Sequence, residues 1–263
     1  MGKGIANVEY VRQGSEVTVA DQPNWGFIYR VSAVKDEKWA IGDRVVLPDG
    51  REFNYAKSLA ACIAGQGAEF TATGYTAYTA FAVSAAIGDT AVTVPAATHA
   101  ALTKDELRGG YAILYNAGNA VQFRGIIGND ASILNVAFKI YLDGPLTEAV
   151  VAAVAGIETF QNPYAALRTG TSTNLSKAGV PASTVSAADL YFWVQTAGFS
   201  WAAPQAGVGA TKDKGLFWRH DGSLESVTTA LAVTPAANDT GQYAGFVVEG
   251  SAAGNGPLIM LRG

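Results

Sequence analysis

The sequence predicts an all-β protein made of β-sandwich or barrel-like domains, with an extended N-terminal region and one short helix near 103–109. Three observations predict this class. Glycine accounts for 30 of the 263 residues, apolar and polar residues alternate in short runs typical of strands, and turn-forming residues recur between these runs. A chain of this length can bury a sizeable core without disulfides.

The composition indicates that part of the protein surface is covered by another molecule. Charged residues make up 15% of the chain and hydrophobic residues 49%, whereas soluble domains usually carry about 25% charged residues. The longest apolar run, "AVVAAVAGI" at 149–157, is shorter than the roughly 18 residues of a spanning helix. We therefore expect a subunit of an assembly, with no membrane partner.

The charge balance argues against a partner bound through phosphate groups. The formal net charge is -4, the isoelectric point is near 5.2, and no cluster of Lys and Arg stands out in the sequence. Nucleic-acid binding requires such a cluster, so we expect no nucleic-acid partner.

Residues 1–40 form the first predicted region. Two loosely alternating runs, "VEYVRQGSEVTV" and "GFIYRVSAV", flank the turn-like "DQPNWG", so the region is compatible with strands or with an extended arm. It contains no apolar stretch of the kind found in secretory signal peptides. We expect synthesis in the cytoplasm.

Residues 41–160 form the first predicted β-rich domain, which opens with a hairpin over 42–57. Asp49 and Gly50 supply its turn, and strand alternation then puts Phe53 and Tyr55 on one face. Further predicted elements follow in order: alternating residues 81–95 with a turn at Gly88 and Asp89, the helix started by Thr103 and Glu106 and stopped by Gly109 and Gly110, a hairpin over 111–129, a strand over 137–142 and a weaker strand signal over 146–160.

Residues 161–263 form the second predicted β-rich domain, which follows a polar, turn-rich boundary at 161–179. Its main feature is "YFWVQTAGFSW" at 191–201. As a strand, this segment puts Tyr191 and Trp193 on one face and Phe192 on the other. Large apolar groups on both faces favour a strand buried on both sides, in the core and against another subunit, over an exposed stacking platform for a sugar.

The rest of this domain continues the strand pattern. Gly198 interrupts the aromatic strand, and Phe199 and Trp201 follow on one face. Asp221 and Gly222 predict a hairpin within 215–227, and "PLIMLRG" predicts a last strand.

The sequence contains no recognisable catalytic set, so we expect no enzyme, no cofactor and no metal site. The two histidines, His99 and His220, are not at zinc-ligand spacing and do not lie in a nucleophile motif. The single cysteine, Cys62, lies in the apolar run "LAACIA" and is interpreted as a core residue. Carboxylate pairs of glycosidases meet only in the fold, so a polysaccharide-degrading enzyme stays as a third alternative.

The order of these segments resembles the capsid decoration (cement) and minor structural head proteins of tailed bacteriophages. The resemblance covers residues 40–263 and is most specific at Asn162-Pro163-Tyr164 and from Gly179 to Thr196. The segments that carry it are "GDRVVLPDGREFNYAK", "LRGGYAILYNAG", "FRGIIGN", "QNPY", "KAGVPASTVSAADLYFWVQTAGFSWA" and "GVGA".

The resemblance implies a homotrimeric virion structural protein that binds the major capsid protein on the outer surface of the phage head and stabilises the shell by bridging capsomers. Under this interpretation we expect capsid or subunit contacts from Trp25, Phe27, Tyr29, Asp49, Gly50, Phe53 and Tyr55, and a core or trimer-interface strand from Tyr191, Phe192, Trp193, Phe199 and Trp201. The alternative is a head-fibre or tail adhesin that binds host surface glycan through exposed aromatics such as Trp201 or Trp218.

Overall fold

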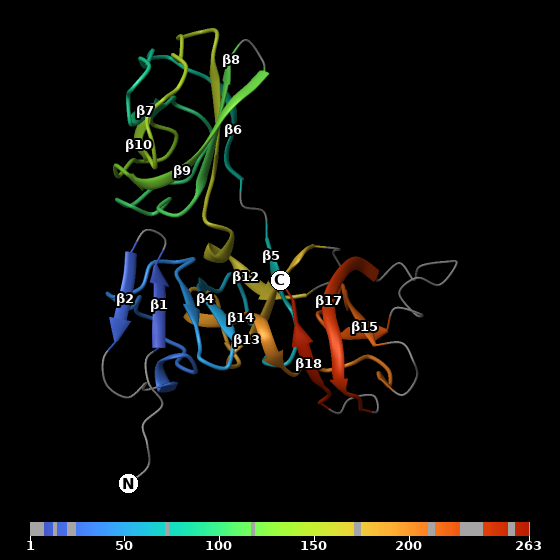
Figure 1. Cartoon of the computed structure of the whole chain (residues 1–263). Coiled ribbons are helices and arrows are strands. Elements are labelled where there is room, and N and C mark those ends of the chain that lie inside the picture. Colours follow the sequence, from blue (N-terminus) through green and yellow to red (C-terminus); the bar gives the residue numbers. More distant parts are fainter. Residues whose placement is uncertain are drawn as a thin grey trace. The chain divides into compact units, whose positions relative to one another are not determined.

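The computed structural model describes residues 8–12, 15–19, 25–71, 74–116, 119–170, 175–209, 214–226, 239–251 and 256–262. As predicted, the described chain is nearly all β, and its strands form two curled antiparallel sheets (Figure 1). The chain divides into a larger unit, Met1–Thr71 with Tyr164–Gly263, and a smaller unit, Ala72–Pro163.

The larger unit contains a sheet with the strand order β16-β15-β17-β18-β14-β4-β3-β1-β2, to which β13, β5 and β12 are attached beside β14. Its strands are β1 (Val8–Arg12), β2 (Ser15–Val19), β3 (Arg44–Val46), β4 (Glu52–Lys57), β5 (Ala68–Phe70), β12 (Leu167–Thr169), β13 (Lys177–Pro181), β14 (Tyr191–Ser200), β15 (Gly215–Arg219), β16 (Leu224–Ser226), β17 (Asp239–Glu249) and β18 (Leu258–Leu261). The 3₁₀ turn η1 (Trp25–Phe27) precedes β3.

The smaller unit contains a sheet with the strand order β6-β11-β8-β9-β10-β7. Its strands are β6 (Gly74–Ala80), β7 (Ala91–Val94), β8 (Tyr111–Asn116), β9 (Asn119–Asn129), β10 (Phe138–Leu142) and β11 (Gly156–Phe160), and a second 3₁₀ turn, η2 (Pro163–Ala165), follows β11. One face of this sheet packs on a core that includes Leu107, Leu114, Ile126 and Ile140.

The expected division at residues 40 and 160 differs from the observed one. The smaller unit is an insertion, so the larger unit is built from two separate stretches of chain. Within the expected N-terminal region, Ile28 is only 1% exposed and packs in a core with Val45 and Phe53. Residues 28–40 are therefore part of the larger unit, because its core needs their apolar side chains.

The short helix expected near 103–109 is instead a run of turns. The capping contact does form, since the Thr103 amide donates to the Glu106 carboxylate at 2.7 Å. Asp105, however, has a φ of 61°, a left-handed conformation that cannot continue a right-handed helix. The segment bends back toward β9, where the Leu107 amide donates to the Asn129 side chain.

The hairpins expected from turn-forming residues are present in the structure. The amide of Gly50 donates to the Leu47 carbonyl between β3 and β4, and Gly222, with a φ of 83°, closes the turn between β15 and β16. The pairs β8–β9 and β17–β18 are also antiparallel. These four antiparallel pairs confirm the strands predicted at 42–57, 111–129, 215–226 and the C-terminal end.

Candidate functional site

The aromatic strand β14 is buried on both faces by its own chain. Trp193 packs with Tyr55 and Val45 in one core, whereas Phe192 packs with Leu167 and other residues in a second core on the opposite side of the sheet. The predicted two-sided burial is confirmed. Burial of the second face does not require another subunit, because the chain itself covers that face.

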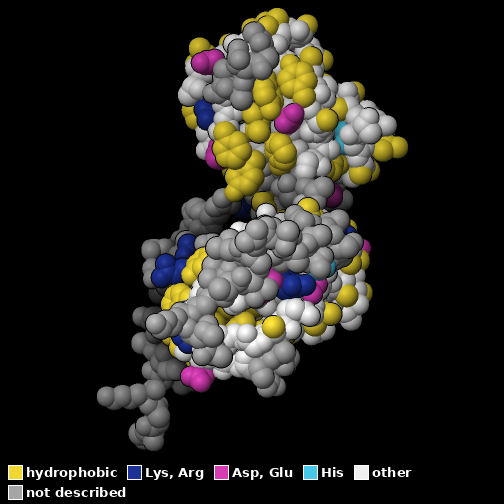
Figure 2. All heavy atoms as spheres, turned by 90° about the vertical axis from the view of Figure 1, so that its right-hand side faces the viewer, with side chains coloured by type: hydrophobic (Ala, Val, Ile, Leu, Met, Phe, Trp, Pro, Cys, Tyr) yellow, Lys and Arg dark blue, Asp and Glu magenta, His cyan; other side chains and the backbone are white. Residues whose placement is uncertain are grey.

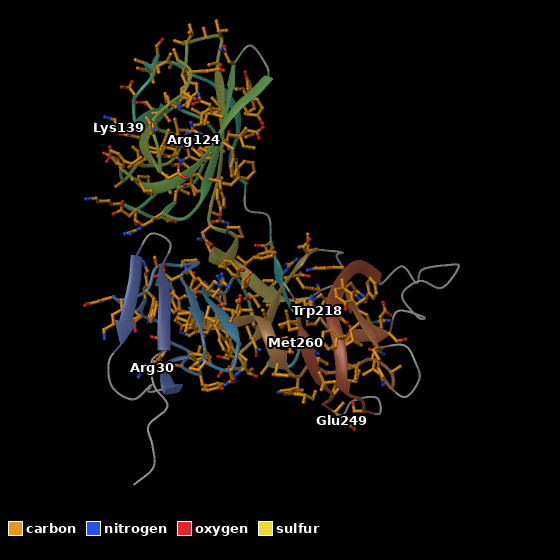
Figure 3. The ribbon with its side chains drawn as sticks, viewed as in Figure 1. Arg30, Arg124, Lys139, Trp218, Glu249 and Met260 are labelled. Carbon is orange, nitrogen blue, oxygen red and sulfur yellow. The ribbon has the colours of Figure 1, made fainter. Side chains whose placement is uncertain are left out.

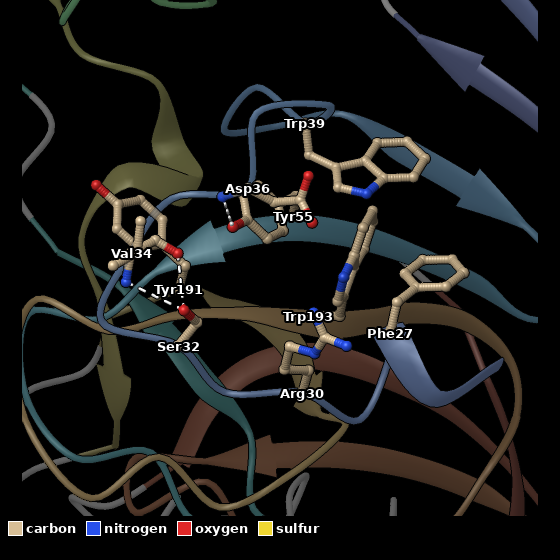
Figure 4. Close-up of a pocket in the computed structure, with 9 residues that line it drawn as sticks. All are labelled: Phe27, Arg30, Ser32, Val34, Asp36, Trp39, Tyr55, Tyr191 and Trp193. Carbon is tan, nitrogen blue, oxygen red and sulfur yellow. Dashed lines mark hydrogen bonds between the residues drawn. The ribbon is translucent and has the colours of Figure 1, made fainter. Parts of the chain in front are cut away.

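One aromatic pocket lies beside β14, under the segment that follows η1 (Figure 4). Phe27 and Trp39 are nearly parallel with ring centroids 5.8 Å apart, and Trp193 meets both rings edge-on, at 5.6 and 5.0 Å. The opening has a volume of about 230 Å³, and its lining consists of Phe27, Arg30, Ser32, Val34, Asp36, Trp39, Tyr55, Tyr191 and Trp193.

The polar groups of this pocket serve mainly to hold the segment in place. The Asp36 amide donates to the Tyr55 hydroxyl at 3.0 Å, and Ser32 pairs with Tyr191 through backbone hydrogen bonds. Burial raises the pKa of Tyr55 above its usual value. Because the rings fill one another's space, this pocket is best explained as the packing of residues 27–39 onto the sheet.

A second opening in the larger unit is a groove of about 300 Å³ with two chemically different ends. Its aromatic end contains Phe199 and Trp201, which are 44% and 53% exposed. Its polar end contains Arg51 and Tyr29, the latter 50% exposed. The complete lining is Tyr29, Arg51, Phe53, Ala64, Gly65, Val180, Pro181, Ala182, Gln195, Phe199, Ser200, Trp201 and Leu258.

The outer face of the smaller sheet is a third candidate surface. Alternation along β8 and β9 turns Tyr111, Ile113 and Phe123 away from the core. Tyr111 stacks on Phe123 with ring centroids 5.1 Å apart, and Tyr78 meets Tyr115 edge-on at 5.3 Å. We call this surface, made of Tyr78, Tyr111, Ile113, Tyr115, Phe123, Ile127 and Tyr141, the outer aromatic face.

Polar partners at the outer aromatic face are hydrogen-bonded to its tyrosines. The Tyr115 hydroxyl donates to Glu158 at 3.0 Å, and the Tyr141 hydroxyl donates to Asp130 at 2.9 Å. Partial desolvation and the Glu158 carboxylate raise the pKa of Tyr115, and the hydrogen bond to Asp130 raises the pKa of Tyr141. Both shifts favour the neutral phenol, the form that tyrosine already adopts at neutral pH.

The structure places the predicted contact residues in different environments. Phe53 and Tyr55 are only 1% and 4% exposed, so their prediction as contact residues is corrected: they face the core of the larger unit. Phe27 is half-buried against Trp39. The side chain of Trp25 lies outside the described residues.

Other predicted residues do reach the surface. Tyr29, Asp49 and Gly50 are exposed, and Phe199 and Trp201 extend beyond the buried part of β14. Trp218 does not: it is 2% exposed (Figure 3) and lies in a core of the larger unit separate from that of Phe53 and Tyr55, which removes it as a glycan-binding residue. The outer aromatic face was missed, although the alternation in "YAILYNAG" already puts Tyr111, Ile113 and Tyr115 on one side.

The described residues form neither a metal-binding group nor a membrane-spanning helix. Among them, no three His, Cys, Asp and Glu side chains gather into a group that could hold a metal ion. His99 is buried, and its two ring nitrogens lie 2.5 and 2.9 Å from the Ala100 and Val136 carbonyl oxygens. Within the described parts of the chain, no helix has the length and hydropathy required to span a bilayer.

Comparison of the chain with protein-family models, with curated proteins and with solved structures finds no match.

Proposed function

We propose that this chain is a virion structural protein, a capsid decoration subunit that binds the outer surface of an assembled phage head. Two observations support the proposal. The first is the resemblance of residues 40–263 to phage decoration proteins. The second, which carries most weight, is the outer aromatic face: Phe123 and Ile127 are 61% and 56% exposed on β9, an inner strand of the smaller sheet.

An apolar face of this kind favours a binding role. Monomeric proteins rarely expose contiguous apolar patches larger than roughly a few hundred Å², and patches above that size mark interaction sites. Figure 2 shows hydrophobic side chains gathered on one face of the smaller unit. Exposed large apolar residues of this unit are Tyr78, Val83, Ile87, Phe123, Ile127, Ile133, Leu134, Val136, Tyr141, Val151 and Val154.

The composition of the outer aromatic face suits a protein partner. Aromatic side chains are enriched and charged ones depleted at the centre of protein interfaces. The stacked pair of Tyr111 and Phe123 supplies rigid rings that lose little conformational entropy on binding. Lys139, exposed on β10, provides charge beside the aromatic rings, as at the rim of such interfaces.

The mechanism follows from mass action. A subunit that binds the assembled shell and not its free components lowers the free energy of the shell, so the shell resists heat and internal pressure. Bridging neighbouring copies of the major capsid protein multiplies modest contacts through effective concentration. The proposed state is a homotrimer, made in the host cytoplasm and placed on the outer capsid surface, with Tyr29 and the turn at Asp49 and Gly50 as secondary contacts.

The proposal is tested by mixing purified protein with undecorated heads. Size-exclusion chromatography with light scattering should show a trimer that co-elutes with the heads, and the heads should withstand a higher temperature when decorated. The double variant Phe123→Ser/Ile127→Ser should bind heads at least roughly tenfold more weakly, because two exposed anchors are lost.

The matched control is Tyr243→Ser, which removes an aromatic side chain of similar exposure (44%) from β17 of the larger unit. It should leave head binding unchanged. Wild-type protein that neither co-elutes with heads nor changes their thermal stability would contradict the proposal. Equal loss in the control and the double variant would contradict the role given to the outer aromatic face.

A further inference from the structure

The groove lined by Trp201 and Arg51 combines a fixed aromatic ring with a guanidinium group that can donate several hydrogen bonds. Its aromatic end comes from the far end of β14, and its polar end comes from the β3–β4 hairpin and the turn after η1. We propose that this groove binds a neutral saccharide. The inference goes beyond capsid decoration and is tested separately from it.

The Trp201 ring is held in place while much of its surface stays accessible. A Cβ atom added at Gly65, whose φ is 80°, would lie 2.6 Å from Cη2 of Trp201, and one added at Gly256 would lie 3.2 Å from Cε3. The indole thus packs directly on glycine backbone. The Ala203 amide donates to the Gly65 carbonyl at 2.7 Å and ties together the two segments that meet at the ring.

A rigid, half-exposed indole is suited to the apolar face of a pyranose ring. Tryptophan offers a large amphipathic contact area with few rotatable bonds, so little entropy is lost when a ligand stacks on it. Phe199 and Leu258, both 44% exposed, extend this apolar surface along the groove. A ligand can therefore bury its non-polar carbons while its hydroxyl groups reach toward the polar end.

At the polar end, the Arg51 guanidinium is oriented before any ligand arrives. Its Nε donates to Asp49 at 2.7 Å, and its Nη1 lies 3.4 Å from the Tyr29 hydroxyl. The guanidinium carbon also lies 5.9 Å from the centroid of the Phe53 ring. These contacts leave Nη2 as a donor for a ligand oxygen, beside a tyrosine hydroxyl that can donate or accept.

The charge and size of the groove favour a small neutral ligand. Asp49 forms an ion pair with Arg51, so the polar end carries a compensated charge and offers hydrogen bonds more than net attraction for an anion. A volume of about 300 Å³ is at the lower end of the range of small-molecule sites. A mono- or disaccharide unit of a larger glycan fits this description better than a long peptide.

The full-length protein should be screened on an array that holds neutral hexose, N-acetylated and acidic glycans, with proline-rich peptides as a separate set. Hits should then be titrated by calorimetry at low and at high salt. We expect binding to neutral glycans that changes little with salt, because the charge of Arg51 is already paired. Binding of acidic glycans alone with steep salt dependence, or of peptides alone, would overturn the proposal.

Variants locate the site. Trp201→Ala should weaken binding about tenfold, since stacking on the ring is lost, and Trp201→Phe should recover part of it. Arg51→Lys keeps the positive charge but loses the planar set of guanidinium donors, so it should also weaken binding. Tyr243→Ser is the control outside the groove, and thermal unfolding checks that each variant is folded. Unchanged binding in folded Trp201→Ala, or no glycan bound by the wild type at millimolar concentration, would overturn the proposal.

Discussion

Phe192 and Trp193 are neighbours on β14, yet their side chains belong to two different hydrophobic cores on opposite sides of one sheet. Strand geometry makes this possible, because successive side chains point to opposite faces. The strand therefore joins two of the three hydrophobic cores of the larger unit, and it pairs with β4 on one edge and with β13 and β18 on the other. Removing a buried aromatic side chain of β14 should therefore destabilise the larger unit more than removing an exposed one.

Trp193→Ala should destabilise the larger unit by about 3–5 kcal/mol, because a large side chain that is 2% exposed leaves a cavity in a packed core. Phe199→Ala, on the same strand but 44% exposed, should cost less than about 1 kcal/mol. Urea unfolding followed by far-ultraviolet circular dichroism measures both values. Similar losses in the two variants would contradict the assignment of Trp193 to the core.

Gly179 should tolerate no side chain. Its φ is 147°, and a Cβ atom would lie 2.1 Å from the Gln195 carbonyl oxygen on β14. Gly50 also has a positive φ, of 82°, but no atom lies within 4 Å of the position that a Cβ would occupy there, so it isolates the cost of backbone strain. Gly50→Ala should cost about 1–2 kcal/mol, and Gly179→Ala should cost a further 1–3 kcal/mol or so from overpacking. Equal midpoints in a denaturant titration would refute the close approach of β13 and β14.

Glu69 and Lys177 form a buried ion pair. Replacing both residues should destabilise the protein no more than the worse of the two single replacements. Lys177 Nζ donates to Glu69 at 2.8 Å and to the His220 carbonyl at 2.8 Å, and Arg168 contacts the other Glu69 oxygen. Burial lowers the pKa of Lys177, although Glu69 opposes this. Glu69→Leu should cost about 3–5 kcal/mol, because it leaves the buried Lys177 ammonium without its carboxylate partner. Lys177→Leu should cost less, because Arg168 still pairs with Glu69.

The double variant Glu69→Leu/Lys177→Leu should be no less stable than the worse single variant. A double-mutant cycle in denaturant gives the coupling, and additive losses would contradict it. Asp189→Asn is the control: its pair with Lys57 is equally short at 2.8 Å, but the Asp189 side chain is 79% exposed. It should leave the free energy of unfolding nearly unchanged, because exposed ion pairs contribute little to stability.

Cys62 should be unreactive while the protein is folded. Its side chain is fully buried, and burial raises the pKa of the thiol to about 12, so almost no thiolate forms at pH 8. A chromogenic disulfide reagent should label one thiol per chain in denaturant and none within minutes in native buffer. Rapid labelling of folded protein at pH 8 would show that the segment around Cys62 opens readily.

Strand positions and hairpin turns could be predicted from the sequence because they depend on neighbouring residues. Alternation at 191–200 and turn residues such as Asp49, Gly50 and Gly222 act over a few positions. Local patterns also predicted a helix at 103–109, which the structure replaces with a run of turns. The reasons are the left-handed backbone of Asp105 and the hydrogen bond from the Leu107 amide to the Asn129 side chain. A capping signal was present, but tertiary contacts outweighed it.

The sequence by itself determined the all-β class, the main hairpins and the burial of the aromatic strand on both faces. Only the tertiary structure decided what covers each face: Tyr55 pairs with Trp193 across β4 and β14, so it became core, while Trp201 became part of an open groove. It also decided that the smaller unit is an insertion in the larger one. The physical reason is that alternation tells which side chains share a face, whereas burial depends on strands paired across more than a hundred residues.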